Sequence, residues 1–156
     1  MRRQNELKLR SATLEDAHDL WLWRNDPVTR ANSFHGQKIS LREHTRWLQK
    51  SLRSRRRRIY IATRKGERAG TIRFDFLPPK VIQISINLSP EFRGKGYGKL
   101  ILKKASDLMI KKYPDHFQKA LIKKGNQKSE KVFTSAGFLK IHETEEGYSV
   151  WIRNSH

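Results

Sequence analysis

A glycine-rich turn, Arg93-Gly94-Lys95-Gly96-Tyr97-Gly98, lies between the apolar run Val81–Leu88 and the helix-like run Lys99–Ile110. Glycine carries no Cβ, so the chain can turn tightly there and a ligand can approach the main chain. The first N–H groups of a helix have no internal hydrogen-bond partner and lie at the positive end of its dipole. Strand, glycine turn and helix in this order therefore predict a diphosphate site, and hence a phosphorylated cofactor.

The order of residues in the turn excludes two common kinds of nucleotide-binding site. The chain contains no G-x-x-x-x-G-K-[ST] string, and the turn follows several strands instead of opening a βαβ unit, as a dinucleotide fingerprint would. The order Arg93-x-x-Gly96-x-Gly98 resembles instead the [QR]-x-x-G-x-[GA] motif of the GNAT superfamily, the acetyl-CoA-dependent N-acetyltransferases.

Four flanking segments carry the same resemblance, in the order that the family has. They are Trp21-Leu22-Trp23-Arg24-Asn25-Asp26, His44-x-x-Trp47-Leu48, Ile84–Phe92 and Asn126-x-x-Ser129-x-x-x-Phe133-x-x-x-Gly137-Phe138. The resemblance extends from about Leu7 to Ile152. It implies an α/β (α+β) fold, in which a mixed, mostly antiparallel sheet of about seven strands has helices on both faces.

Local patterns place the elements that must position these residues. Ser40-Leu41-Arg42-Glu43 is a capping box that opens a helix, and Lys65-Gly66-Glu67 is a hairpin signal between two alternating runs. Pro27 is expected to stop the first helix. We expect strands at Leu7–Arg10, Ile59–Arg64, Ala69–Phe76, Val81–Leu88, Lys119–Lys123, Phe138–His142 and Tyr148–Ile152, and helices over Thr13–Asn25, Ser40–Leu52, Lys99–Lys112 and Ser129–Ala136.

Composition sets the broad class. The chain has 156 residues, no cysteine, and six histidines without metal-ligand spacing, so we expect one domain over residues 1–156 and no metal. No stretch approaches the roughly 18–20 apolar residues of a membrane span, and the first residues lack the apolar region of a signal peptide. The expectation is a soluble cytoplasmic protein with no membrane partner.

The resemblance implies a cofactor, acetyl-CoA, and a role for each matching residue. The acceptor amine attacks the thioester directly in a ternary complex. The main-chain N–H of Leu88 polarises the thioester oxygen, and Ile86–Leu88 pairs with the pantetheine arm between the fourth and fifth strands. Arg93–Gly98 holds the pyrophosphate. The remaining expected contacts are Lys95, Lys99 and Lys128 to phosphates, and Asn126 and Ser129 to the distal arm of the cofactor.

One position departs from the family pattern. Many GNAT enzymes have a tyrosine, the acid that protonates the leaving thiolate, where this chain has Phe133. Phenylalanine has no donor, so the proton comes from water or another side chain, or the thiolate leaves unassisted, since thiols ionise near pH 8.5. Phe133 itself is expected to pack against the pantetheine or the core.

The general base stays open. Glu91 lies just before the phosphate turn, Asn87 is on the fourth strand, and His35 is in the loop after the first helix. Asp75 shares a strand face with Arg73 by period-two alternation, so the pair binds or deprotonates the acceptor, or forms an ion pair only. Asp75, Asn87 and Glu91 are the catalytic candidates.

The net charge of the chain indicates what charge the acceptor carries. The net charge of +19 steers an anionic cofactor inward and disfavours polyamines, aminoglycosides and lysine-rich tails as acceptors. It favours an anionic acceptor, which is a nucleotide-linked amino sugar and hence a small-molecule amine, a nucleic acid or an acidic polymer. The alternative is that the excess charge only provides solubility. The run Arg55-Arg56-Arg57-Arg58 is either a phosphate-binding patch or a solvated face.

A narrower resemblance, to one branch of the family, indicates which kind of acceptor the enzyme uses. Trp23-Arg24-Asn25-Asp26, with His44-x-x-Trp47 and Ile72-Arg73-Phe74-Asp75, resembles enzymes that acetylate nucleotide-linked amino sugars in nonulosonic (pseudaminic or legionaminic) acid biosynthesis. It implies acceptor contacts at Trp23, Arg24, Asn25, Phe34, His35 and Arg73.

Two other function classes remain open. One is a protein N-terminal or ribosomal-protein acetyltransferase, in which similar motifs occur. The other is a basic RNA-associated protein whose acetyl site is degenerate or acts on aminoacyl-RNA. Nucleic acid as a partner is supported by charge alone, without an RNA-binding motif. A homodimer is also left open.

Overall fold

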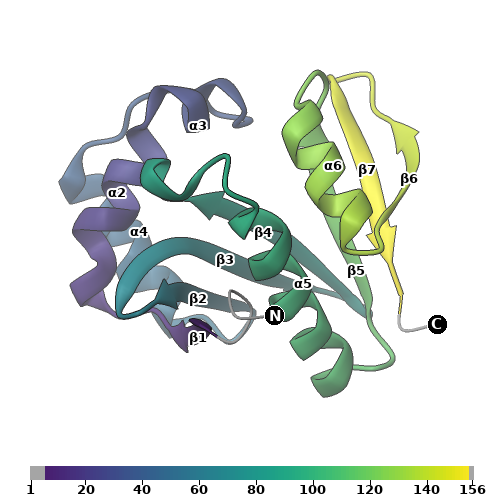
Figure 1. Ribbon diagram of the computed structural model, residues 1–156, viewed down its shortest axis with the longest axis horizontal. Coiled ribbons are helices and arrows are strands. Elements are labelled where there is room, and N and C mark those ends of the chain that lie inside the picture. Colours follow the sequence, from purple (N-terminus) through teal and green to yellow (C-terminus); the bar gives the residue numbers. More distant parts are fainter. Residues whose placement is uncertain (1–5, 155–156) are drawn as a thin grey trace.

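Seven strands form the sheet that carries the predicted site, in the order β1-β2-β3-β4-β5-β7-β6. The computed structural model describes residues 6–154 (Figure 1). All neighbouring strands are antiparallel except β4 and β5, which are parallel. The strands are β1 (Leu7–Ser11), β2 (Arg57–Arg64), β3 (Glu67–Leu77), β4 (Val81–Leu88), β5 (Phe117–Lys123), β6 (Leu139–Glu143) and β7 (Tyr148–Arg153). The predicted fold class is confirmed.

The helices divide between the two halves of the sheet. Figure 1 shows α2, α3 and α4 beside the β1–β4 half, α5 in the middle and α6 beside β5 and β7. The helices are α2 (Ala17–Asn25), α3 (Pro27–Ala31), α4 (Leu41–Arg53), α5 (Tyr97–Lys112) and α6 (Gln127–Ser135), with short 3-10 turns η1 (Leu14–Asp16) and η2 (Pro90–Phe92). No helix in the described part of the chain is long and apolar enough to cross a membrane.

Two apolar clusters hold the helices to the sheet. The main core joins α5, through Ile101, Leu102, Ala105 and Met109, to the inner residues of β3 and β4. A smaller cluster places α2 and α4 on the opposite side, where Leu20, Trp23 and Leu48 meet Ile59 and Ile61 of β2. Because both faces of the central strands are covered, β2, β3 and β4 form a rigid platform for the residues at their ends.

Caps define where the two N-terminal helices begin. Thr13 and Asp16 form the predicted capping box before η1, and the Ser40 hydroxyl accepts from the Glu43 N–H at the start of α4. The expectation that Pro27 ends all helix is wrong. Proline suits the first position of a helix, and the Asp26 carboxylate accepts from the Val28 and Thr29 N–H groups, so a second short helix, α3, begins at Pro27.

Asp16 is a buried charge that ties β1 to the β2–β3 hairpin. Its side chain is 0% exposed and accepts from Arg10 at 2.7 and 2.9 Å, from Arg68 Nε at 2.7 Å and from the Thr13 N–H at 2.8 Å. Burial alone would raise the pKa of Asp16, but the bonds from Arg10, Thr13 and Arg68 outweigh it and lower the pKa to about 2.

We therefore expect Asp16→Asn to lower the free energy of unfolding by about 2 kcal/mol at pH 7. A carboxylate with a lowered pKa stabilises the fold above its unfolded pKa, near 4, and this stability is lost as the pH falls through about 2. Urea unfolding from pH 7 to pH 2.5 should show the two proteins converging at the acid end. Asp19→Asn, which removes a half-exposed partner of Arg68 only, is the control and should change the free energy by less than about 0.5 kcal/mol. A pH-independent difference would contradict the assignment.

Candidate active site

The phosphate turn (Arg93–Gly98) presents bare backbone. Gly94 and Gly96 have φ angles of +71° and +82°, a region that favours glycine, and a Cβ added to either would meet no atom within 4 Å. Gly96 is the N-cap of α5, so the helix begins at a residue with no capping side chain. The main chain at both glycines therefore borders open space at a helix N-terminus, and this arrangement fits a diphosphate.

The last two residues of the turn, Tyr97 and Gly98, are buried and pack against the rest of the protein. The Tyr97 ring packs edge-to-face on Phe92, with 5.3 Å between ring centroids. A Cβ on Gly98 would lie 3.4 Å from Leu88 Cδ1 and 3.6 Å from a Val132 methyl carbon. Gly98 thus lets α5 pack closely on β4 and α6. Two lysines are exposed here: Lys95 within the turn and Lys99 directly after it.

The second feature of the site is the free edge of β4. All of β4 pairs with β3, from Val81 opposite Leu77 to Leu88 opposite Gly70. On its other side β4 pairs with β5 only at Val81, Ile82 and Gln83. Beyond Gln83 the two strands diverge, and residues 84–88 have no strand partner on that edge within the described residues.

The orientation of the Leu88 amide follows from its neighbour. The Ser89 N–H donates to Ala69 O of β3 at 2.9 Å. Because successive N–H groups of a strand point to opposite edges, the Leu88 N–H points away from β3, toward the diverging side. The structure therefore brings the phosphate turn and an outward-pointing amide together at the end of β4, with Ile86 on the same strand.

The other predicted cofactor segment is the N-terminus of α6. Asn126 is the N-cap: its Oδ1 accepts from the Ser129 N–H at 3.3 Å, and its Nδ2 donates to Ser129 Oγ at 3.0 Å. Lys128 is exposed beside this cap. Phe133 is only 4% exposed and packs edge-to-face on Phe138 in the main core, so it supports α6 from inside and does not line the site.

Asp75 and Arg73 lie elsewhere. Asp75 pairs with Gln83, five residues along β4 from Leu88, or about 17 Å at strand spacing. Its carboxylate accepts from the Nε atoms of Arg57 and Arg73, and both guanidinium groups lie within 6 Å of the Trp47 ring centroid, at 5.5 and 5.8 Å. These contacts join β2 and β3 to α4, as expected for the ion-pair alternative, and a role of the pair in binding or deprotonating the acceptor stays a prediction. The Arg55–Arg58 run is at the same remote end.

The other two catalytic candidates differ in what they can do. Asn87 is next to Leu88, and its Oδ1 accepts from the Thr29 hydroxyl at 3.1 Å. A side-chain amide is not a base at neutral pH, so Asn87 can position groups but cannot remove a proton. Glu91 is exposed in η2 and lines a surface hollow with Asp19, Leu22 and Arg68.

Two of the predicted acceptor contacts are structural. Trp23 is 5% exposed and belongs to the smaller apolar cluster, so its ring is not available for stacking on a substrate. Asn25 clamps the chain before α4: its Nδ2 donates to Ile39 O at 2.7 Å, and its Oδ1 accepts from the Ile39 N–H at 2.8 Å. These partners give both residues a structural role, and their contact with the acceptor stays a prediction.

Arg24 at the end of α2 and Arg30 in α3 are both bonded to the loop around His35. Arg24 Nη2 donates to His35 O at 2.6 Å, and Arg30 donates to Asn25 O at 3.1 Å and to Gly36 O at 3.3 Å. Neither guanidinium pairs with a carboxylate of the described residues.

The charges of Arg24 and Arg30 lower the pKa values of neighbouring basic groups. Burial lowers the pKa of Arg24, and the charge of Arg30 lowers it further. Burial likewise lowers the pKa of His44, with a further contribution from Arg24. Among residues 6–154 no acid is bonded to either guanidinium, so the two positive charges have backbone partners only.

Phe34 reaches the other half of the sheet. Its ring packs edge-to-face on Tyr148 of β7, with 4.1 Å between centroids. Just before it, Ala31 O accepts from Lys123 Nζ of β5 at 2.8 Å. The segment from α3 to Phe34 therefore connects the β4 half of the sheet to β5 and β7.

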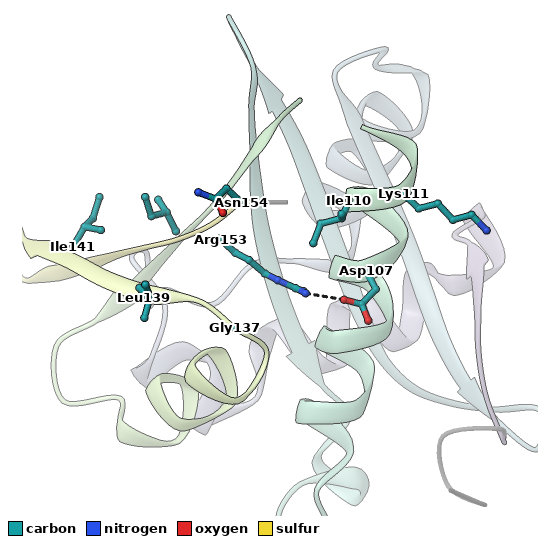
Figure 2. A pocket seen from close by; sticks show the side chains of 9 residues that line it. Asp107, Ile110, Lys111, Gly137, Leu139, Ile141, Arg153 and Asn154 are labelled. Atoms are coloured by element: carbon teal, nitrogen blue, oxygen red, sulfur yellow. Dashed lines mark hydrogen bonds and ion pairs between the residues drawn. The ribbon is translucent and has the colours of Figure 1, made fainter. Parts of the chain in front are cut away.

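A larger hollow between α5, β6 and β7 lies away from this site. Figure 2 shows Leu139 and Ile141 on one side, Ile110 on the other, and the Arg153–Asp107 ion pair between them. Asp107 is ten residues along α5 from Tyr97, or about 15 Å. The two charged groups of this ion pair have further partners, because Arg153 also donates to Ser106 and Asp107 also accepts from Lys103.

A family model described as "Acetyltransferase (GNAT) domain" matches residues 6–139. The chain belongs to the GNAT acetyltransferase family. This GNAT protein is therefore an N-acetyltransferase that uses acetyl-CoA. A comparison with curated protein sequences finds no match.

Solved structures with similar folds agree with this assignment. A spermidine N-acetyltransferase from Vibrio cholerae, in complex with CoA and spermine, is 17% identical with a TM-score of 0.88, over 96% of this chain and 95% of that one. A domain from Methanocaldococcus jannaschii is 21% identical, with a TM-score of 0.83 and coverages of 95% and 97%. The aminoglycoside acetyltransferase AAC(6')-Ib with coenzyme A is 20% identical, with a TM-score of 0.81 and coverages of 95% and 94%. None of these three is named as acting on a nucleotide-linked sugar, so that narrower branch remains a prediction.

The sequence reasoning missed Asp26, Thr29 and Tyr148. The first two were missed because Pro27 was interpreted only as a helix stop. An aspartate directly before a proline is also the pattern of an N-cap followed by a first helical residue, and that pattern would have revealed α3. Nothing in the local sequence connects Tyr148 to Phe34.

The phosphate turn can be tested with a matched pair of variants. Gly96→Glu should weaken acetyl-CoA binding at least about 100-fold, because it adds bulk and negative charge where the main chain meets a diphosphate. Gly66→Glu is the control: Gly66 has the same φ of +82° and an equally open Cβ direction, but lies in the β2–β3 turn. Calorimetric titration should show near-normal binding in the control and similar stability in both variants. Normal affinity in Gly96→Glu would contradict the placement.

Proposed function

We propose that this protein transfers the acetyl group of acetyl-CoA to the primary amine of a small anionic acceptor, of the class of nucleotide-linked amino sugars. The observation that carries the proposal is the uncompensated positive charge of Arg24 and Arg30. A phosphorylated acceptor would neutralise that charge, whereas a polyamine would add to it. The net charge of +19 acts in the same direction over a longer range.

The residues that would hold acetyl-CoA follow from the site. The main chain of the phosphate turn, with Lys95 and Lys99, would bind the diphosphate, and Asn126, Lys128 and Ser129 would contact the distal arm. Bound there, acetyl-CoA supplies an activated acyl group. The free edge at Ile86–Leu88 offers amide partners for the pantetheine arm, and the outward Leu88 N–H is a donor for a carbonyl oxygen.

The acceptor must lose a proton before its amine can attack. Asp75 is committed to Arg57 and Arg73, and Asn87 cannot act as a base. The positive charge of Arg24 and Arg30 offers another route, since nearby cations disfavour an ammonium group and lower its pKa. The amine would then react as the free base, without a carboxylate to deprotonate it, and the thiolate would leave without an acid at Phe133.

We expect Asp75→Asn to keep kcat/KM within about threefold of the wild-type value, because the carboxylate supports the fold and not the chemistry. The pH profile of kcat/KM should rise to a plateau whose midpoint moves when acceptors of different amine pKa are compared. Measurements at matched folded fraction remove any loss of stability. A 100-fold loss of activity at all pH values would instead identify Asp75 as the base.

The acceptor class is tested by thiol release at fixed acetyl-CoA. The panel holds a nucleotide-linked amino sugar, a free amino sugar without phosphate, a polyamine and an N-terminal peptide. Turnover should favour the first, and Arg30→Gln should raise its KM about 10- to 100-fold while leaving the KM of the free amino sugar unchanged. Arg46→Gln, an exposed arginine on α4, is the control. Preference for the peptide would indicate a protein acetyltransferase, and salt-dependent RNA binding without turnover would indicate the RNA-associated alternative.

A further inference from the structure

The Arg93 side chain does not extend over the phosphate turn that it opens. Its Nη1 donates to Asp26 Oδ2 at 2.7 Å, and its Nη2 donates to Thr29 Oγ1 at 2.8 Å. Asp26 is the N-cap of α3 and Thr29 lies within this helix, which is near the end of β4 in Figure 1. The guanidinium fork thus ties the acceptor-side helix to the first residue of the turn.

Thr29 also hydrogen-bonds to β4. Its hydroxyl accepts from Arg93 and donates to Asn87 Oδ1 at 3.1 Å. Asn87 directly precedes Leu88, whose N–H points to the free edge of β4. One hydroxyl therefore links α3, the phosphate turn and the strand that carries the outward amide.

Asp26 holds the near end of the same helix. Its Oδ2 accepts from the Val28 N–H at 3.0 Å and from the Thr29 N–H at 3.2 Å, besides the bond from Arg93. Burial alone would raise the pKa of Asp26, but the bonds from Arg93, Thr29 and Val28 outweigh it and lower the pKa.

The far end of the segment is held by the other half of the sheet. Ala31 O accepts from Lys123 Nζ of β5, and Phe34 packs on Tyr148 of β7. The segment Pro27–Phe34 is thus fastened at both ends, across the two strands that diverge beyond Gln83. Its position relative to Leu88 is set by side-chain bonds of α3 rather than by sheet pairing.

We propose that Thr29 and Asp26 are positioning residues for acetyl transfer: through Arg93 and Asn87 they fix the acceptor side of the site relative to the Leu88 amide. This inference rests on the proposed function, because it assumes that α3 and the loop to His35 border the acceptor. It assigns Arg93 a side-chain role in acceptor placement, while its main chain remains part of the phosphate turn.

The test is a threonine series with kinetics for each substrate separately. Thr29→Val removes the hydroxyl and keeps the shape, so kcat/KM for the acceptor should fall about 10- to 100-fold, while KM for acetyl-CoA stays within about twofold. Thr29→Ser restores a hydroxyl and should recover most of the loss. Thr134→Val is the control: it removes a hydroxyl that donates to Glu130 O at 2.7 Å within α6.

A second variant probes the charged half of the network. Asp26→Asn keeps the shape but ends the ion pair with Arg93, and it should give the same split between acceptor and acetyl-CoA parameters. The proposal is overturned if Thr29→Val behaves like Thr134→Val, if serine fails to rescue, or if the parameters for both substrates fall equally.

An acceptor-free measurement separates this proposal from the proposed function. Hydrogen exchange of the Pro27–Phe34 segment should slow when coenzyme A binds the wild-type protein, and this protection should be lost in Thr29→Val although coenzyme A still binds. That result supports the positioning role whichever amine is the substrate. Equal protection in both proteins overturns it, and the acceptor panel alone then decides the acceptor class.

Discussion

The divergence of β4 from β5 is the constraint on which the rest of the site depends. Backbone N–H and C=O groups need hydrogen-bond partners, and a central strand normally finds them on both sides. β4 has them on both sides only over Val81–Gln83. Over the next five residues its outer edge offers amide groups to whatever enters between the two halves of the sheet. An extended ligand with its own amides, such as the pantetheine arm, matches that edge in the way an added strand would.

The same divergence explains why the helices around the site are joined by side chains. Where strands pair, register fixes the position of neighbouring elements to a fraction of a residue. Across the open side of β4 there is no register, so α3 is placed by Arg93, Thr29 and Asn87 at one end and by Lys123 and Tyr148 at the other. Single polar substitutions can therefore shift this part of the site while the sheet stays intact.

The sequence was sufficient for the backbone of the site. Alternation and turn signals located all seven strands. The positions of the glycines in the phosphate turn indicated where α5 begins, because only glycine adopts φ angles near +80° without strain. These features are local, so a short window of residues determines them. Pro27 shows the limit of the approach: the same proline can end one helix or begin the next, and the choice depends on Asp26.

The roles of side chains were harder to predict, because they depend on partners distant in the sequence. Period-two alternation correctly placed Arg73 and Asp75 on one strand face, but it could not show that Arg57 and Trp47 already occupy that face. Trp23 and Asn25 were matched to a motif by type, and the structure assigns both to holding α2 and the chain before α4 in place. Conversely, the sequence singled out Arg24 but not Arg30, and only the structure shows that both cations have backbone partners and no acid among the described residues.

That pair of cations changes the electrostatic problem that the site has to solve. A site built around a carboxylate base attracts an ammonium group and then has to remove its proton. A site built around arginines repels the ammonium form, and it gains affinity for an amine only if another part of the same molecule is negative. Specificity for an anionic acceptor and the absence of a committed base would then have one cause, since the field that binds the phosphate also favours the neutral amine. This links the net charge of +19, the ion-paired state of Asp75 and the phenylalanine at position 133 in one physical account.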